Sequence, residues 1–112
     1  MTQAAEAQAF LAMAGYDTNS ILESMPGLLN LAASGNVDLG RAADITTNIM
    51  SAFNIEAERT GEVADILAYA SANANTNLEQ MGEAMKYVAP TSNTLGLSIE
   101  DTAAAIMAVS DA

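Results

Sequence analysis

The sequence contains no cysteine and no histidine. Without cysteine the chain cannot form a disulfide, a thiolate metal site or a cysteine nucleophile. Without histidine it lacks the commonest general base and the commonest ligand for transition metals. We therefore expect no catalytic residue, no cofactor and no metal site.

Positive charge is almost as scarce, because three Lys and Arg residues stand against 14 Asp and Glu residues for a net charge of -11. Each contact with a nucleic-acid phosphate needs a cation, so nucleic acid and anionic membrane surfaces are poor partners. No uncharged apolar stretch reaches the roughly 18 residues that a membrane span requires. No basic segment followed by an apolar run marks a signal peptide. A soluble chain with an acidic, solvated surface is expected.

Hydrophobic residues make up 51% of the chain but aromatic residues only 4%. The apolar side chains are mainly Ala, Leu, Ile and Met, which favour thin packing of helix on helix over a thick core. Nothing shows the sustained alternation of a strand. The sequence predicts one all-α domain over residues 1–112, built as stacked helical hairpins. About six short helices are expected, over residues 2–14, 18–35, 38–53, 56–74, 76–90 and 98–112.

Helix starts and stops are marked by capping residues and by proline. Thr18 and Asp38 are candidate N-caps, and Ser98 with Asp101 forms a candidate capping box. Thr76 with Glu79 gives the best predicted capping box. Pro26 should restart or kink the second helix, while Pro90 and then Gly96 should end the fifth.

A weak internal echo recurs after about 40 residues. The start Asp38-Leu39 resembles Asn77-Leu78, and 66–68 resembles 106–108. Two copies are fewer than the three that make a solenoid convincing, and Ala-rich helices resemble one another by chance. The repeat stays an open hypothesis at this stage.

The carboxylates around Arg59 are the densest group of reactive side chains. An acid-base pair would need two of them held in a pocket that drives their pKa values apart. No polar or aromatic partner nearby suggests such a pocket. The pattern favours a solvated helix face made by Glu56, Glu58, Glu62 and Asp65.

Seven methionines, six of them at apolar helix positions (Met13, Met25, Met50, Met81, Met85 and Met107), admit two interpretations. They fill the core of a helical domain, which is the commoner case, or they form an adaptable binding surface. A thin Ala and Met layer leaves apolar surface exposed, so self-association into a homo-oligomer is a reasonable hypothesis. The candidate interaction surface consists of Leu78, Met81, Met85 and Val88.

Several phrases resemble the core region of tail tape measure proteins of long-tailed phages and their prophage relatives. The most specific are Met81-Gly82-Glu83-Ala84-Met85-Lys86 and the alternating Ala and Asn of residues 72–75. The other matching phrases lie within residues 9–15, 25–33, 38–45, 68–76, 81–90 and 96–104, so the resemblance covers nearly the whole chain. The family pattern continues past Ala112 into a Gly-rich stretch, which implies that this chain is a fragment of the core region.

The resemblance implies a long helical protein that occupies the tail lumen, templates assembly of the tail tube and sets tail length by its own length. Its implied partners are the tail tube protein and tail assembly chaperones. Its implied location is the host cytoplasm before assembly and the virion tail lumen afterwards. The alternative function is a small soluble helical protein-interaction module unrelated to tails.

Overall fold

The computed structural model describes residues 2–74 and 77–111. Within these residues it contains α-helices, one short 3₁₀ helix and no strand, which confirms the all-α prediction. The elements are α1 (Thr2–Met13), α2 (Thr18–Gly35), α3 (Leu39–Phe53), η1 (Ala57–Arg59), α4 (Thr60–Asn73), α5 (Leu78–Leu95) and α6 (Ile99–Asp111).

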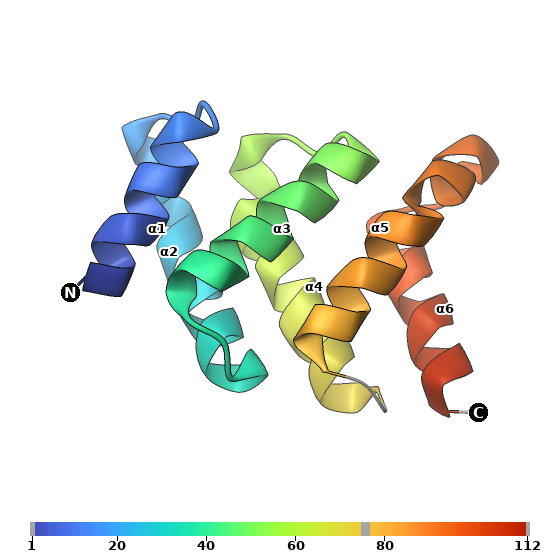
Figure 1. Ribbon diagram of the computed structural model, residues 1–112. Helices are drawn as coiled ribbons and strands as arrows, with labels where there is room; N and C mark the ends of the chain where they lie inside the picture. The colour runs from blue at the N-terminus through green and yellow to red at the C-terminus, as the bar shows by residue number, and fades with distance from the viewer. Residues whose placement is uncertain (1, 75–76, 112) are drawn as a thin grey trace.

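The helices form two layers. Helices α1, α3 and α5 lie side by side in one layer, and α2, α4 and α6 lie side by side in the other (Figure 1). Each odd-numbered helix turns back into the even-numbered helix that follows it, so the fold is a stack of three helical hairpins. The stack measures 40 × 28 × 17 Å, a thin slab of the kind that the Ala-rich composition predicts.

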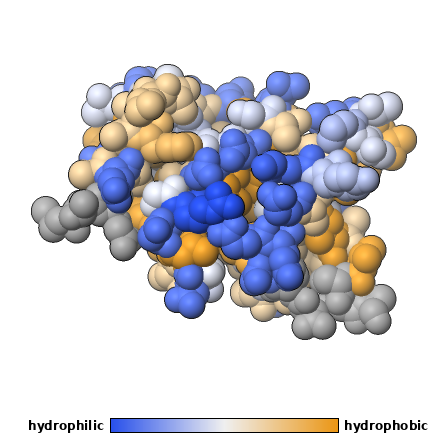
Figure 2. All heavy atoms as spheres, viewed as in Figure 1, coloured by the Kyte–Doolittle hydropathy of each residue, from blue (hydrophilic) through white to orange (hydrophobic). Residues whose placement is uncertain are grey.

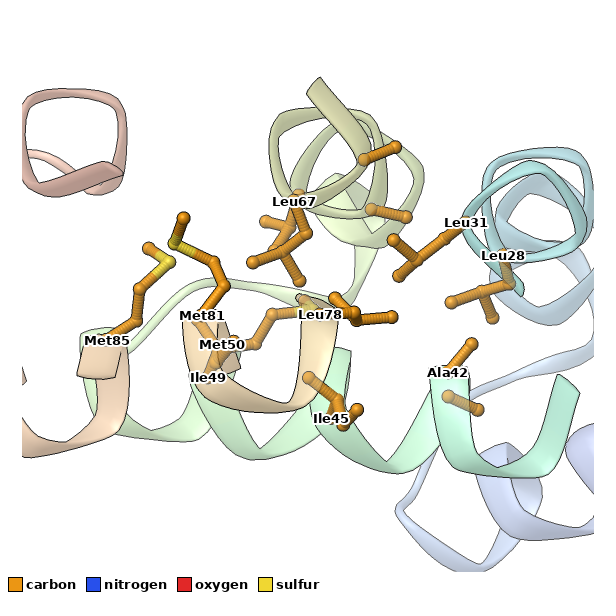
Figure 3. Packing of buried hydrophobic residues seen from close by; sticks show 14 of the residues in the cluster. Leu28, Leu31, Ala42, Ile45, Ile49, Met50, Leu67, Leu78, Met81 and Met85 are labelled. Atoms are coloured by element: carbon orange, nitrogen blue, oxygen red, sulfur yellow. The ribbon is translucent and has the colours of Figure 1, made fainter. Parts of the chain in front are cut away.

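The core lies between the two layers. Leu28 from α2, Ile49 from α3 and Leu67 from α4 all point into the space between the layers, and all three are fully buried (Figure 3). Met81 and Met85 of α5 reach into the same space and are also fully buried. Most apolar methionines therefore fill the core, although Met13 of α1 is 87% exposed, contrary to its predicted apolar role.

The burial pattern repeats every 39 residues over three copies. Leu28, Leu67 and Ile106 are spaced at this interval, one on the second helix of each hairpin. Three hairpins in one register confirm a repeat with a period of 39 residues. The match of Asp38-Leu39 with Asn77-Leu78 is in this register, whereas the match of 66–68 with 106–108 is one residue out of it. Ile106 is only partly buried. Four other triplets at the same spacing are buried throughout: Ala7, Thr46 and Met85; Leu11, Met50 and Ala89; Ser24, Val63 and Thr102; Met25, Ala64 and Ala103.

Two predicted helix starts are confirmed and one is shifted. The Asp38 carboxylate accepts the Arg41 backbone N–H at 2.7 Å, and Ser98 and Asp101 exchange hydrogen bonds as a capping box. Thr18 is the first residue of α2 and not its N-cap. Asp17 holds that position because its carboxylate accepts the Ser20 N–H at 2.8 Å.

The capping box predicted at Thr76 and Glu79 is wrong. The box is formed one residue later, where Asn77 accepts the Gln80 N–H at 2.8 Å and Gln80 accepts the Asn77 N–H. Thr76 lies outside the described residues. Glu79 instead forms an ion pair with Arg41 of α3. An Asn side chain caps a helix as well as Thr does.

Neither proline ends or restarts a helix, contrary to prediction. α2 is continuous through Pro26, and α5 runs past Pro90 to Leu95, where Gly96 takes the left-handed cap conformation at φ 77°. Each proline removes one backbone hydrogen bond. Both prolines are exposed, as are Leu22 and Lys86, the residues one turn earlier. Water can therefore solvate the carbonyl that loses its partner, while packing on the opposite face holds the helix.

The residues at helical spacing along one side of α3 are all buried: Leu39, Ala42, Thr46, Ile49, Met50 and Phe53. On α1 Ala7 and Leu11 are buried, but Ala14, which follows this helix, is exposed. The fourth helix begins later than predicted, because residues 57–59 form a 3₁₀ turn before α4 starts at Thr60. Gly61 then sits in the first turn of α4, where it packs against Gly27 of α2.

Candidate functional site

The four residues of the candidate interaction surface do not share an exposed face. Leu78, Met81 and Met85 are buried within the chain's own core, at 1% exposure or less. Val88 is only partly buried and lies about one to three turns further along α5 than the other three. In this fold a partner could reach Val88 but not the other three side chains directly.

Val88 belongs to an open groove between α5 and α6, at the last hairpin of the stack. The groove has a volume of about 520 Å³, and none of its lining residues is charged. Hydrophobic side chains reach the surface at this edge of the molecule, over α6 (Figure 2). We call it the α5–α6 groove, and its lining residues are Gln80, Met81, Ala84, Val88, Ser92, Leu97, Thr102, Ala105, Ile106 and Val109.

The base of the α5–α6 groove is held by a buried hydrogen bond between its two helices. The Thr102 hydroxyl donates to the Ser92 hydroxyl at 3.0 Å, and it is also 2.9 Å from the Ser98 carbonyl. Both side chains are buried. Both hydroxyl groups therefore have hydrogen-bond partners within the protein, and the groove floor is a packed surface and not a polar pocket.

A second furrow of about 460 Å³ runs between α4 and α6. Its floor is apolar and includes Ile66 and Met107, but Glu62, Asp65 and Glu100 stand at its rim. This furrow separates two helices that already contact each other. The charged rim makes it a more hydrated surface than the α5–α6 groove.

An ion pair fastens α5 to α3. Arg41 binds Glu79 in a two-point contact, with Nε 2.9 Å from Oε2 and the terminal nitrogen 2.5 Å from Oε1, and it also reaches Asp44. These hydrogen bonds lower the pKa of the Glu79 carboxyl below its usual range. Both side chains are over 40% exposed, so the pair positions the helices more than it stabilises them.

The other two cations are also paired with carboxylates. Arg59, the last residue of η1, contacts Glu62 of α4 at 2.6 Å and Glu100 of α6 at 3.4 Å. Lys86 lies 3.6 Å from Glu83 on its own helix. The chain's three cations are thus all engaged, and two of them tie neighbouring hairpins together.

The carboxylate cluster around Arg59 is the solvated face that the sequence predicts. Glu56, Glu58, Glu62 and Asp65 are all exposed. Within residues 2–74 and 77–111 no group of three or more acidic side chains is arranged to hold a metal ion. None of the described helices is both long enough and apolar enough to cross a membrane.

The match to known families decides the identity. The family model of phage-related minor tail proteins matches residues 1–112. The chain belongs to this family. As a phage minor tail protein it is a structural component, and its place is the virion tail.

Two curated relatives of this minor tail protein are tape measure proteins. The tape measure protein of Pneumococcus phage Dp-1 is 43% identical over 98% of the chain, and the probable tape measure protein of Escherichia phage P2 is 31% identical over 97%. The chain spans only about a tenth of these relatives, 10% and 13% of their lengths. No solved structure matches the chain.

Sequence reasoning missed most of the α5–α6 groove, including Ala84, Leu97, Ala105 and Val109. These residues resemble ordinary core positions, because their helical spacing is the same as that of buried residues. A signal was present in the 39-residue period for two of them, because Ala84 and Val109 repeat the positions of Ile45 and Ala70, which are buried. Leu97 and Ala105 repeat Glu58 and Ile66, which are not, so the period gives no signal for them.

Proposed function

We propose that this chain is a segment of a tape measure protein, which templates polymerisation of the tail tube and sets tail length by its own length. The observation that carries the proposal is the 43% identity to a tape measure protein over 98% of the chain. The repeat supports it, because a stack of equal hairpins is a structure that can lengthen in equal steps. A helical module unrelated to tails is not favoured by these relatives.

The segment acts by interaction and performs no catalysis. Three features support this part of the proposal: the sequence has neither histidine nor cysteine, the densest acidic cluster is exposed, and the α5–α6 groove has no charged lining residue. The partners are the tail tube protein, tail assembly chaperones and further copies of the chain itself. The segment occupies the host cytoplasm before assembly and the tail lumen afterwards.

The net charge of -11 fits a scaffold that must leave the lumen when DNA passes. A surface with so few cations, each already paired with a carboxylate, offers DNA phosphates little to bind. Like charge then favours release of the protein over trapping by the DNA.

The length role can be tested by adding copies of one repeat in the phage that encodes this segment. Residues 39–77 form a clean unit, because Asp38 and Asn77 both cap the helix that follows them. One repeat adds about 10 Å if it stacks as a hairpin, and about 58 Å if it runs as a single helix at 1.5 Å per residue.

We expect tail length in electron micrographs to rise in proportion to one, two and four inserted copies. The slope distinguishes the folded stack from an extended helix. A phage carrying Tyr87→Gln, which changes an exposed side chain and adds no length, should keep tails of the original length. Tails of constant length across the insertion series would show that the length of this segment does not set tail length.

A further inference from the structure

We propose that the contact between α4 and α6 is a hinge, at which the third hairpin, α5–α6, rotates about α5 relative to the rest of the stack. In this motion α5 stays on α3, while α6 swings toward or away from α4. Arg59 holds the closed position through its ion pair with Glu100. The inference rests on a difference between two equivalent contacts inside the stack, and it does not depend on the length-setting role.

The contact of α2 with α4 and the contact of α4 with α6 occupy equivalent places in the repeat. Each joins the second helix of an outer hairpin to α4 of the middle hairpin (Figure 1). We call them the first seam and the second seam. Because α2 and α6 both belong to outer hairpins, their position in the stack cannot account for a difference between the two seams.

The first seam is closed by two glycines. An added Cβ on Gly27 of α2 would lie 3.0 Å from the carbonyl oxygen of Gly61 and 3.4 Å from the Cβ of Ala64, both on α4. Backbone therefore packs directly on backbone. Helices in such contact cannot rotate against each other without a collision or a loss of close packing.

The second seam lacks this glycine pair. The positions 39 residues after Gly27 and Gly61 are occupied by Ile66 and Glu100. Both side chains line the furrow of about 460 Å³ between α4 and α6. Ile66 is only partly buried and Glu100 is exposed, so larger side chains with access to solvent separate the two helices. Packing of this kind opposes small rotations less than backbone contact does.

The axis of rotation is α5, because this helix is held on α3 along its length. Near the start of α5, Glu79 forms the ion pair with an arginine of α3. In the middle, an added Cβ on Gly82 would lie 2.9 Å from Cγ2 of Ile45. Near the end, the Asn93 amide donates to the Ala52 carbonyl at 2.8 Å. The buried hydrogen bond at the base of the α5–α6 groove ties α6 to α5, so the hairpin moves as a unit.

The polar contact across the second seam is exposed. Arg59 lies 2.6 Å from Glu62 and 3.4 Å from Glu100, and the Arg59 and Glu100 side chains are 36% and 53% exposed. Exposed ion pairs contribute little to stability, so this contact can break and re-form. If the Arg59 charge were removed, the three carboxylates that line the furrow, Glu62, Asp65 and Glu100, would repel one another. The cation therefore determines how far α6 stands from α4.

Distances across the two seams test the proposal. The chain has no cysteine, so spin labels can be attached to introduced cysteines alone. Asn30, Tyr69 and Ala108 are exposed equivalents on α2, α4 and α6. Asn30→Cys with Tyr69→Cys reports on the first seam, and Tyr69→Cys with Ala108→Cys on the second. Double electron–electron resonance should give a broader distance distribution for the second seam, and equal widths would overturn the proposal.

A pair within the third hairpin separates rotation of the hairpin from fraying of α6. Tyr87 on α5 is 87% exposed and can carry the second label. Tyr87→Cys with Ala108→Cys should give a distribution as narrow as that of the first seam, because α5 and α6 move together. A distribution as broad as that of the second seam would mean that α6 alone is loose, and it would overturn the hinge.

Removing the Arg59 charge should open the second seam. We expect Arg59→Gln to lengthen the second-seam distance by ~2 Å, the size of helix shifts at packed interfaces, and to leave the first seam unchanged. The matched control is Lys86→Gln, which removes the same charge from an ion pair within α5 and should alter neither distance. A shift in both seams, a shift in neither, or an equal shift in the control would overturn the proposal.

A second variant tests the spacing of the helices by itself. Ile66→Ala with Glu100→Ala should shorten the second-seam distance and narrow its distribution, because smaller side chains let α6 approach α4. An unchanged or longer distance would show that these two side chains do not hold the helices apart, and it would overturn the proposal. Circular dichroism and the first-seam distance should show that the rest of the stack stays folded in every variant.

Discussion

Gly27 illustrates how closely two helices approach at single residues. A Cβ added there would lie 3.0 Å from the Gly61 carbonyl oxygen and 3.1 Å from the Gly61 Cα. Both atoms belong to the backbone, so no side-chain rotation can relieve the contact. The only response is for α2 and α4 to move apart, which loosens the packing around Leu28 and Leu67.

We expect Gly27→Ala to destabilise the fold by ~1–3 kcal/mol, the usual range for overpacking, despite the ~1 kcal/mol that Ala gains in helix propensity. Urea denaturation measures this change in stability as a shift of the unfolding midpoint at an unchanged m value. Gly40→Ala is the control, because a Cβ there meets only the Asp38 carboxylate at 3.7 Å. Its midpoint should stay level or rise. A raised midpoint for Gly27→Ala would show that the two helices are not held at this distance.

Tyr16 joins the first hairpin to the second through its hydroxyl. This group lies 2.7 Å from the Thr60 hydroxyl, which is fully buried and 2.7 Å from the Ala57 carbonyl. Desolvation is the main cause that raises the pKa of Tyr16, and the negative charge of Glu58 adds to it, while the Thr60 hydrogen bond acts the other way. Folding therefore favours the neutral phenol.

A raised pKa in the folded state gives stability that is present below the unfolded value of about 10 and is lost as pH rises through the folded value. We expect the urea midpoint to fall between pH 9 and pH 11, and Tyr16→Phe to reduce that fall. Tyr87→Phe, at an exposed residue, should leave the fall as it is. An identical fall in the chain and in Tyr16→Phe would contradict the role of Tyr16.

At the scale of elements, Arg41 and Glu79 form an ion pair between α3 and α5, which are also joined by the Asn93 amide donating to the Ala52 carbonyl. Because the pKa of Glu79 is lowered, its contribution is present above the unfolded value of about 4.3 and is lost as pH falls through the folded value. We expect Glu79→Gln to lower stability by less than ~1 kcal/mol at pH 7, since both partners are substantially exposed. At about pH 2 the difference should vanish.

Glu83→Gln provides the matched control for chemical denaturation at the two pH values. It removes the same charge, but Glu83 is 73% exposed and pairs with Lys86 on its own helix. It should change stability less than Glu79→Gln does at pH 7. Equal effects of the two substitutions would show that net charge, and not the contact between helices, determines the result.

At the scale of the whole molecule, 14 carboxylates against three cations create a repulsion that the folded state concentrates. Salt screens this repulsion, and it also weakens the few exposed ion pairs. Because like charges outnumber ion pairs, the net effect of salt should be to stabilise the folded state. We expect the urea midpoint to rise by the equivalent of ~1 kcal/mol between about 20 mM and about 500 mM NaCl. A falling midpoint would mean that the ion pairs outweigh the repulsion.

This measurement is best made at low protein concentration. Association of copies would raise apparent stability by mass action, and dilution removes that contribution.

The sequence by itself determined the helical class, the approximate number of helices and most of the buried faces. Helical spacing of apolar residues places Ala42, Ile49 and Phe53 on one side of α3 whatever surrounds it, because 3.6 residues complete each turn. Asp38 and Ser98 marked their helix starts for a similarly local reason, since a capping side chain bonds to an amide two or three residues away. Short stretches of sequence, such as residues 81–86, also indicated the tail protein family.

Only the tertiary structure decided what depends on neighbours distant in the chain. Pro26 and Pro90 stay inside helices because packing on one face holds the helix and solvent reaches the other. Leu78, Met81 and Met85 share the spacing of Val88, yet they are buried because α3 and α4 cover them, and no described helix covers Val88 in the same way. Helical periodicity tells which side of a helix is apolar, but burial depends on the elements packed against that side, and those are placed by the fold.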